Sequence, residues 1–503
     1  MIDESRLREL AMKLSAARIF LSADAREATI DGIDMELLAT RVIEKNRGSA
    51  DAVFAGAKEL DEIVRSMSSE KVAEPIEVLR QPGFKPVAAE LEPEIKIDER
   101  KPEHVSGTVD DFVDYFRDRL ARLRHIIESN RQSLYGLVPS MESLRGFPEG
   151  REVTIIGIVT TKFVTKSGNI LVIIEDETAE AKAIFMNGTS QKVKELFVKA
   201  ESITNDEVIA VRGKLSRGFL MVSEIVWPDI PIKSRRTSEN DLAIAFLSDV
   251  HVGSKLFMDK NFRHMLSWLN GGVSKQEQLA GKIKYIIIAG DAADGIGVYP
   301  GQDRDLAIQD VYLQYRLLIN LLDAVPDYVH VFILPGNHDA VQRAEPQPSL
   351  GKAMVDEMSR GNIHMVTNPC SLTLDGFEVL AYHGTSLDSV ISAVPNNSYA
   401  RPEKAMVELL RRRHLSPIYG GNVVVPSRKD GMVIESVPDI LHMGHIHKNG
   451  LTEYHGVEVV NSGTWQARTE FQVRQGHIPS PCVLPVFETK EHRFSSINFG
   501  DGQ

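Results

Sequence analysis

Five short apolar runs between residues 242 and 447 each end in a cluster of aspartate, asparagine, histidine or glycine residues. The runs occupy residues 242–246, 285–289, 329–335, 379–382 and 440–443. The clusters that follow them are Ser248-Asp249-Val250-His251, Gly290-Asp291, Gly336-Asn337-His338-Asp339, His383-Gly384 and Gly444-His445-Ile446-His447. Short apolar runs bounded by turn-forming residues are typical of buried strands. Because ligands of open α/β sheets bind beyond the ends of neighbouring strands, the pattern predicts that one such edge gathers all five clusters.

The residue types in these clusters are those that bind divalent metal ions. Oxygen and nitrogen ligands without a thiolate suit hard to borderline cations. Asp249 and His251 are two residues apart and point the same way on an extended segment, and His445 and His447 repeat this spacing. A lone Asp-x-His or Gly-Asp pair is common, so the prediction depends on all five clusters together. With Asp291 bridging through its two oxygens, two metals about 3.5–4 Å apart would clamp a phosphate and activate a water or hydroxide.

The complete set resembles the calcineurin-like metallophosphoesterase superfamily, whose pattern is D-x-H, G-D, G-N-H-[ED], H and G-H-x-H. The resemblance covers about residues 240–470. It implies one metal site of Asp249, His251, Asp291 and His447, and a second of Asp291, Asn337, His383 and His445. His338 matches the catalytic histidine near the leaving oxygen, and Asp339 is expected to orient it. A helix N-cap is the alternative role for Asp339.

Length and composition limit the class of protein. A chain of 503 residues is expected to hold more than one domain, and an apolar fraction of 43% supports a sizeable core. No apolar run reaches the length of a membrane span, and the N-terminus lacks the pattern of a secretory signal. Two cysteines are too few for a disulfide framework, so we expect a cytoplasmic protein. A net charge of −12 does not favour a general polyanion binder, so any nucleic-acid contact must come from local basic patches and metals.

The predicted fold is multidomain α+β, and three segments precede a phosphoesterase domain at 240–503. Residues 1–67 carry leucines at helical spacing and predict a helical interaction domain without chemistry of its own. Residues 68–107 contain prolines among glutamates and lysines and predict a flexible acidic linker. Residues 108–235 predict a helix, opened by Thr108 and Asp111 as an approximate capping box, followed by a barrel.

Short strands with intervening turns suggest the barrel. The expected strands are 153–159, 170–174, 181–185, 207–211 and 219–222. Five strands in this space resemble an OB-fold. OB-folds bind single strands through aromatic and basic side chains, but these strands carry few aromatic residues, so a structural or subunit-docking barrel is an equal alternative. The basic residues Lys233, Arg235 and Arg236 follow directly and are either a plain connection or a phosphate contact.

A barrel that leads into a calcineurin-like domain resembles the small subunits of archaeal D-family DNA polymerases. The loop 290–302 is similar to the extended metal loop of that family, and the helical N-terminus and acidic linker suit it. The eukaryotic second subunits resemble this family but have lost metal ligands, whereas this chain has the full set. The calcineurin-like resemblance also implies a two-sheet sandwich flanked by helices.

The resemblance implies a metal-dependent 3′→5′ exonuclease that proofreads for a separate large catalytic polymerase subunit. The expected substrate is DNA with single-stranded or mismatched 3′ ends, and the protein would be archaeal and nucleoid-associated. Mn²⁺ is the favoured metal, with Fe, Zn and Mg as alternatives. Two other functions stay open: a stand-alone metallophosphoesterase acting on small phosphate esters, and a non-catalytic accessory subunit. The Pro-spaced apolar stretch 478–487 either contacts the large subunit or covers a sheet edge of its own domain.

Overall fold

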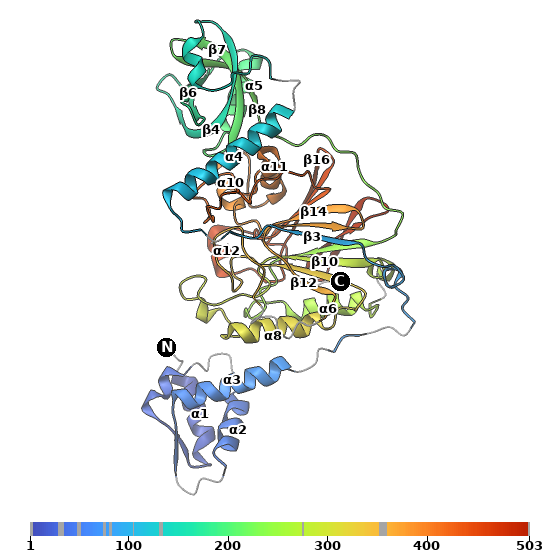
Figure 1. Cartoon of the computed structure of the whole chain (residues 1–503). Helices are drawn as coiled ribbons and strands as arrows, with labels where there is room; N and C mark the ends of the chain where they lie inside the picture. Colours follow the sequence, from blue (N-terminus) through green and yellow to red (C-terminus); the bar gives the residue numbers. More distant parts are fainter. Residues whose placement is uncertain are drawn as a thin grey trace.

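The computed structural model of the chain describes residues 4–28, 35–47, 52–73, 77–79, 83–103, 105–129, 134–273, 276–351 and 360–500. Figure 1 shows a small N-terminal helical part, a layered central body and a barrel at the opposite end of the molecule. The expected mixed α+β, multidomain architecture is confirmed. Within the described residues, no helix has the length and apolar character needed to cross a membrane.

Two six-stranded sheets form the central body, with the orders β12-β11-β10-β9-β18-β19 and β16-β17-β15-β14-β13-β3. The first contains β9 (Ala243–Leu247), β10 (Ile283–Ala289), β11 (His330–Leu334), β12 (Ile363–Met365), β18 (Val483–Glu488) and β19 (Arg493–Asn498). The second contains β3 (Ile95–Glu99), β13 (Cys370–Leu374), β14 (Phe377–Ala381), β15 (Ile440–Met443), β16 (Asn449–Tyr454) and β17 (Val457–Ser462). All five predicted apolar runs form strands. Of these, β9, β10 and β11 are parallel neighbours in one sheet, and β14 and β15 are parallel neighbours in the other.

The sheets pack face to face, and helices cover their outer faces. The core between the sheets contains Ile244, Phe246, Tyr285, Ile287, Phe332, Leu372, Leu374, Val379, Ile440 and Val460. Helices α6 (Asp259–Leu269) and α8 (Val311–Leu322) pack on the first sheet, and α10 (Leu387–Ala393) and α11 (Pro402–Arg412) pack on the second. Two short helices also belong to the described part of the body: α7 (Glu277–Ala280) and α12 (Glu470–Gln475). Strand ends of both sheets are therefore fixed by cores on two sides.

The second folded unit is a closed barrel with the strand order β4-β5-β6-β8-β7. Its strands are β4 (Glu152–Val164), β5 (Ile170–Glu175), β6 (Glu180–Phe185), β7 (Val208–Ser216) and β8 (Phe219–Val226). Each predicted strand is present, because alternate residues such as Val172 and Ile174 fill the interior. Helix α5 (Gln191–Glu201), which lies between β6 and β7, was not predicted.

Helix α4 (Val109–Ser129) connects the barrel to the central body (Figure 1). The predicted capping box at its start is confirmed, since the Thr108 amide donates to Asp111 and the Asp111 amide donates to the Thr108 hydroxyl. Leu120 and Leu123 pack against the barrel strands and against Val433 of the body. One helix face thus joins the two folded units.

A buried ion network strengthens this junction. The Nε of Arg119 lies 2.8 Å from Oδ2 of Asp430, with side-chain exposures of 1% and 0%. Arg119 also donates to the carbonyl oxygens of Asp206 and Pro417, so it contacts the barrel and the body at once. Burial alone would raise the pKa of Asp430, but His414 and Arg119 hold it well below its usual range. Asp430 is therefore ionised, and its negative charge is balanced by the positive charge of Arg119.

Replacing Asp430 by alanine is expected to lower the free energy of unfolding by about 3–5 kcal/mol, because Arg119 is left buried without its counter-charge. Urea unfolding followed by tryptophan fluorescence measures the change. Glu435→Ala is the matched control: Glu435 pairs with Arg122 but is 53% exposed, and exposed pairs contribute about 0–1 kcal/mol. Equal effects of the two substitutions would contradict the role of the buried pair.

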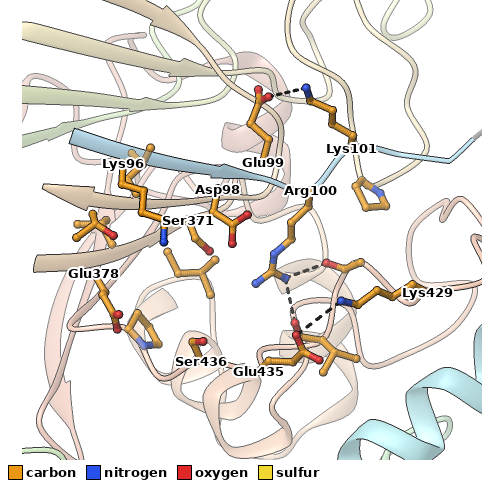
Figure 2. A pocket seen from close by; sticks show the side chains of 18 of the residues that line it. Lys96, Asp98, Glu99, Arg100, Lys101, Ser371, Glu378, Lys429, Glu435 and Ser436 are labelled. Atoms are coloured by element: carbon orange, nitrogen blue, oxygen red, sulfur yellow. Dashed lines mark hydrogen bonds and ion pairs between the residues drawn. The ribbon is translucent and has the colours of Figure 1, made fainter.

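The prediction of a flexible linker at 68–107 is wrong for its second half. Strand β3 pairs antiparallel with β13 as the edge strand of the second sheet. Arg100 then donates through Nη1 to the carbonyl oxygens of Gly431 (2.8 Å) and Val433 (3.0 Å). A cavity of about 410 Å³ lies between β3 and the 427–438 loop, and Arg100 is one of the residues that line it (Figure 2). The segment has too few apolar residues to fold alone, and it takes its hydrogen bonds from an existing sheet instead.

The structure corrects one expectation near the N-terminus and decides between two alternatives near the C-terminus. The N-terminal part contains α1 (Glu4–Ser15), α2 (Met35–Lys45) and α3 (Ala57–Ala73), but also a parallel pair, β1 (Ile19–Leu21) and β2 (Val53–Ala55). It is therefore not purely helical, and α3 continues past residue 67. The stretch 478–487 was offered as a partner contact or a cover for a sheet edge. Its second half is β18, which pairs with both β9 and β19, so the second alternative holds for these residues: they cover the edge of β9 in their own domain.

Candidate metal centre

The five clusters meet beyond the carboxyl ends of β9, β10, β11, β14 and β15. Three groups have ligand atoms within 4.8 Å of one another: Asp249–His251–His447, Asp249–Asp291–His383 and His251–Asp291–His338. The Nε2 of His447 lies 3.2 Å from Oδ1 of Asp249 and 3.2 Å from Nε2 of His251. The Nε2 of His383 lies 3.4 Å from Oδ2 of Asp291. Residues separated by two hundred positions thus form one compact polar cluster.

The backbone at this cluster adopts an uncommon conformation. Positive φ angles occur at Asp249 (50°), His251 (53°), Asp291 (50°), His445 (68°) and His447 (58°). A non-glycine residue in the left-handed region costs about 1–3 kcal/mol and is usually found where the surrounding structure imposes it. Here the sharp turns that follow the strands direct these side chains toward the centre of the cluster. Such strain is typical of functional sites.

Glycines in the motifs allow the carboxylates to approach the backbone. A Cβ on Gly336 would lie 2.2 Å from Oδ1 of Asp291, and a Cβ on Gly444 would lie 2.4 Å from Oδ2 of Asp249. Neither distance is sterically allowed. The glycines before Asn337 and His445 are therefore needed to seat the two aspartates, which explains why these short motifs begin with glycine.

One buried oxygen shows that the cluster suits a cation. Oδ1 of Asp249 is buried and, among the described residues, accepts no well-formed hydrogen bond, although Nε2 of His447 lies 3.2 Å from it, whereas Oδ2 accepts from the His445 amide. An unsatisfied buried carboxylate oxygen is costly. A divalent metal ion would satisfy it, and the surrounding oxygen and imidazole nitrogen atoms are suitable co-ligands. The donor set therefore fits the metals that the sequence predicts.

The charges of the cluster point the same way. Burial alone would raise the pKa of Asp291, but His383, His338 and His251 hold it well below its usual range. Burial opposes the charged form of His383 as well, yet Asp291 raises its pKa to about 10. Asp249 is likewise ionised, since His447 and His383 outweigh its burial. The negative charge must be balanced either by protons on the imidazoles or by bound cations.

Two predicted ligands lie at the margin of the cluster. Asn337 is in contact with it, because its Oδ1 lies 2.9 Å from Nε2 of His383. The ring of His445 lies 5.1 Å from the ring of His383, but its Nε2 is 3.0 Å from Oδ2 of Asp388. His445 is therefore oriented by a carboxylate on α10 that the sequence did not single out. Only its Nδ1 stays available to the cluster.

The expected pairing of Asp339 with His338 is not found. The Nδ1 of His338 lies 2.8 Å from the carbonyl oxygen of Asp294. Asp339 instead accepts from the amides of Ala292, Ala293 and Gly336 and from the hydroxyl of Tyr315. Nor does a helix begin at Asp339, so the N-cap alternative is also wrong. Asp339 joins the loops after β10 and β11, and its effect on the site is to hold these loops together.

Asp294 belongs to the candidate centre, although no motif singled it out. Its Oδ1 lies 2.8 Å from Nδ1 of His251, and its carbonyl oxygen holds His338. Gln302 and Gln466 donate to its carboxylate in turn. The side chain is buried and fixes the orientation of a predicted metal ligand and of the predicted catalytic histidine. Its position in the loop after Gly290-Asp291 is the only sequence signal that pointed to it.

The three basic residues after the barrel are neutralised within the chain. Lys233 and Arg236 both pair with Asp439, and Arg235 pairs with Glu453. These contacts hold the connection between barrel and body against the second sheet. The interpretation as a connection is therefore the better one.

Fold and cluster together define a multidomain α+β protein with a closed barrel and a buried candidate centre for divalent metals. The chain is similar to one protein family and to several solved structures. The family of DNA polymerase alpha/epsilon B subunits matches residues 244–449. A solved structure described as a novel archaeal phosphodiesterase covers 51% of this chain and 99% of its own, with 15% identity and a TM-score of 0.26.

Several known proteins share more of the sequence than this solved structure does. The DNA polymerase II small subunit of Archaeoglobus fulgidus is 42% identical over 384 residues, which are 76% of this chain and 75% of the relative. That of Methanothermobacter thermautotrophicus is 37% identical over 81% of this chain and 83% of the relative. That of Methanocaldococcus jannaschii is 42% identical over 76% of this chain, and the chain spans 64% of that relative's length. The chain belongs to the DNA polymerase II small-subunit family.

Proposed function

We propose that this chain is the nuclease-bearing small subunit of a two-subunit archaeal DNA polymerase. Its cluster hydrolyses DNA phosphodiester bonds from single-stranded or mismatched 3′ ends, and so proofreads for a large catalytic subunit in the cytoplasm, at the nucleoid. The convergence of Asp249, His251, Asp291, His383 and His447 around an unsatisfied carboxylate oxygen supports this proposal most strongly. A purely structural subunit has no need for ionised carboxylates buried beside one another.

Two divalent ions, with Mn²⁺ favoured, would be held by this cluster. Asp249, His251, Asp291 and His447 would hold one, and Asp291, Asn337, His383 and His445 the other. When bound, such ions neutralise phosphate charge and lower the pKa of a water to near 7 (a value typical of zinc sites). A bound cation would take the place of the protons that the imidazoles carry beside these buried carboxylates.

His338 is the proton-transfer residue in this proposal. The carbonyl oxygen of Asp294 is an acceptor only, so Nδ1 of His338 must carry a proton. That leaves Nε2 as the nitrogen that exchanges a proton with the leaving oxygen. The ring lies 4.7 Å from the ring of His251, at the rim of the cluster. Asp294 keeps both rings in place through the reaction.

The surrounding domains fit the same assignment. The two-sheet body is interpreted as a calcineurin-like domain and the barrel as an OB-fold that docks on it. The ion network of Arg119 and Asp430 makes the barrel a fixed part of the subunit, which favours a structural or subunit-docking barrel over a mobile DNA-binding one. A stand-alone phosphoesterase for small esters is the second candidate function, and it would have no need of this docked barrel.

One experiment tests both parts of the proposal. The chain is co-expressed with the large subunit of its polymerase, and the complex is isolated by size exclusion. Chain and complex are then given single strands labelled at either end, with Mn²⁺ or with EDTA. We expect co-elution and Mn²⁺-dependent release of mononucleotides from the 3′ end. Failure to co-elute would refute the partner, and hydrolysis of small esters without any attack on DNA would favour the second candidate.

A further inference from the structure

One exposed aromatic residue lies beside the candidate metal centre and has no role in it. Tyr299 belongs to the loop that follows β10, and 41% of the residue is exposed. Its ring lies 6.3 Å from the ring of His338, at an interplanar angle of 62°. His338 in turn contacts His251 of the cluster. Tyr299 therefore stands at the mouth of the site, next to the proposed proton-transfer residue.

The ring is held in place although it is exposed. The hydroxyl of Tyr299 donates to Oδ2 of Asp305 at 2.9 Å. The amide of Val298 donates to Oε1 of Gln302 at 2.9 Å, and Nη2 of Arg343 lies 2.9 Å from the carbonyl oxygen of Val298. Burial of part of the ring and the bond to Asp305 raise the pKa of Tyr299, so the phenol stays a donor. A fixed aromatic face loses little entropy when a flat ligand stacks on it.

We propose that Tyr299 forms a base-stacking subsite, in which its exposed face receives the nucleobase adjacent to the phosphodiester bond that is cut. This inference rests on the proposed function and names the part of the DNA that this side of the site recognises. The short distance to His338 supports it, since only a sugar separates a nucleobase from its phosphate. The exposed Arg343, whose guanidinium donates to the carbonyl oxygen of Val298, supports a nucleic acid over an apolar protein surface, because a cation bound to the same loop suits a phosphate backbone.

The test compares two single-stranded oligonucleotides of one length, a normal strand and one whose 3′-terminal residues are abasic. Binding to the full chain is measured by fluorescence anisotropy in EDTA, where no hydrolysis is expected. Tyr299→Ala is expected to weaken binding of the normal strand about 5- to 150-fold, the range of one base stacked on an aromatic ring. It should leave binding of the abasic strand unchanged. Tyr299→Phe keeps the ring and is expected to stay within about twofold of the unmodified chain.

Controls separate stacking from a structural effect of the loop. Tyr135→Ala removes another exposed tyrosine, 73% exposed before the barrel, and should change neither affinity. Equal weakening for both strands, or a loss in Tyr299→Phe as large as in Tyr299→Ala, would assign Tyr299 to bracing the loop and overturn the subsite. No weakening for either strand would overturn it as well. If Tyr299 contributes to base-dependent binding but the chain does not hydrolyse DNA under any condition, the proposed nuclease activity is refuted and the proposed stacking subsite is retained.

Discussion

Asp291→Ala is expected to reduce DNA hydrolysis to the background rate. Asp291 lies between His251 and His383, at 3.9 Å and 3.4 Å from their Nε2 atoms, and is the residue assigned to both proposed metal ions. The fold should survive, because the side chain lies beyond the strand ends and its charge raises the pKa of the buried Asp339. Removing it relieves like-charge repulsion even though the hydrogen bond from the His338 amide is lost.

Turnover on a labelled single strand with saturating Mn²⁺, together with the circular dichroism spectrum, measures this effect. Asp303→Ala provides the control, since Asp303 is an exposed carboxylate in the loop that follows the same strand. We expect activity near that of the unmodified chain for the control. An Asp291→Ala protein that is folded and keeps near-normal hydrolysis would contradict the bridging role.

His338→Ala is expected to lower the turnover number by about 10²–10⁴, the usual contribution of a general acid or base. Metal binding should be retained, because His338 is bound through Nδ1 to the Asp294 carbonyl and is not assigned as a ligand. Its ring nevertheless lies close enough to His251 and Asp291 to contact a metal, so the two roles need separation.

Single-turnover kinetics and metal titration of the same preparation make that separation. His264→Ala is a suitable control, since His264 is exposed on α6 and packs against Phe499. A His338→Ala protein that has lost one bound ion would make His338 a ligand and overturn the division of roles.

The metal cluster was predictable from sequence because its residues follow recognisable strands. The apolar runs fold as strands of the two sheets. The polar residues that follow parallel strands of one sheet therefore lie at the same edge of that sheet. This rule brings together Asp249 and Asp291, which follow neighbouring strands of one sheet, whereas His383 follows β14 of the other sheet and reaches them only because the two sheets pack together. The family resemblance implied that the two sheets pack face to face. Alternate apolar residues of β9 and β10 form part of the core between them.

Other features depend on contacts that no local pattern reveals. Strand β3 exists because β13 offers a free edge, and the prolines around it hid this strand. Asp294 and Asp388 orient histidines from distant segments, so neither stood out within its own motif. The role predicted for Asp339 was wrong for the same reason, since it accepts from amides in the loop after β10 and does not pair with its neighbour His338. Long-range hydrogen bonds to these carboxylates were therefore beyond sequence reasoning.

Counting metal ions tests the central claim most directly. The full chain, stripped with chelator, is titrated with Mn²⁺ by isothermal calorimetry beside Asp291→Ala and Asp303→Ala. The account predicts two ions per chain for the unmodified protein and for Asp303→Ala, and loss of the two-ion stoichiometry for Asp291→Ala. A folded, unmodified chain that binds no divalent ion, or whose binding is unaffected by Asp291→Ala, would contradict the claim that this cluster is a two-metal centre.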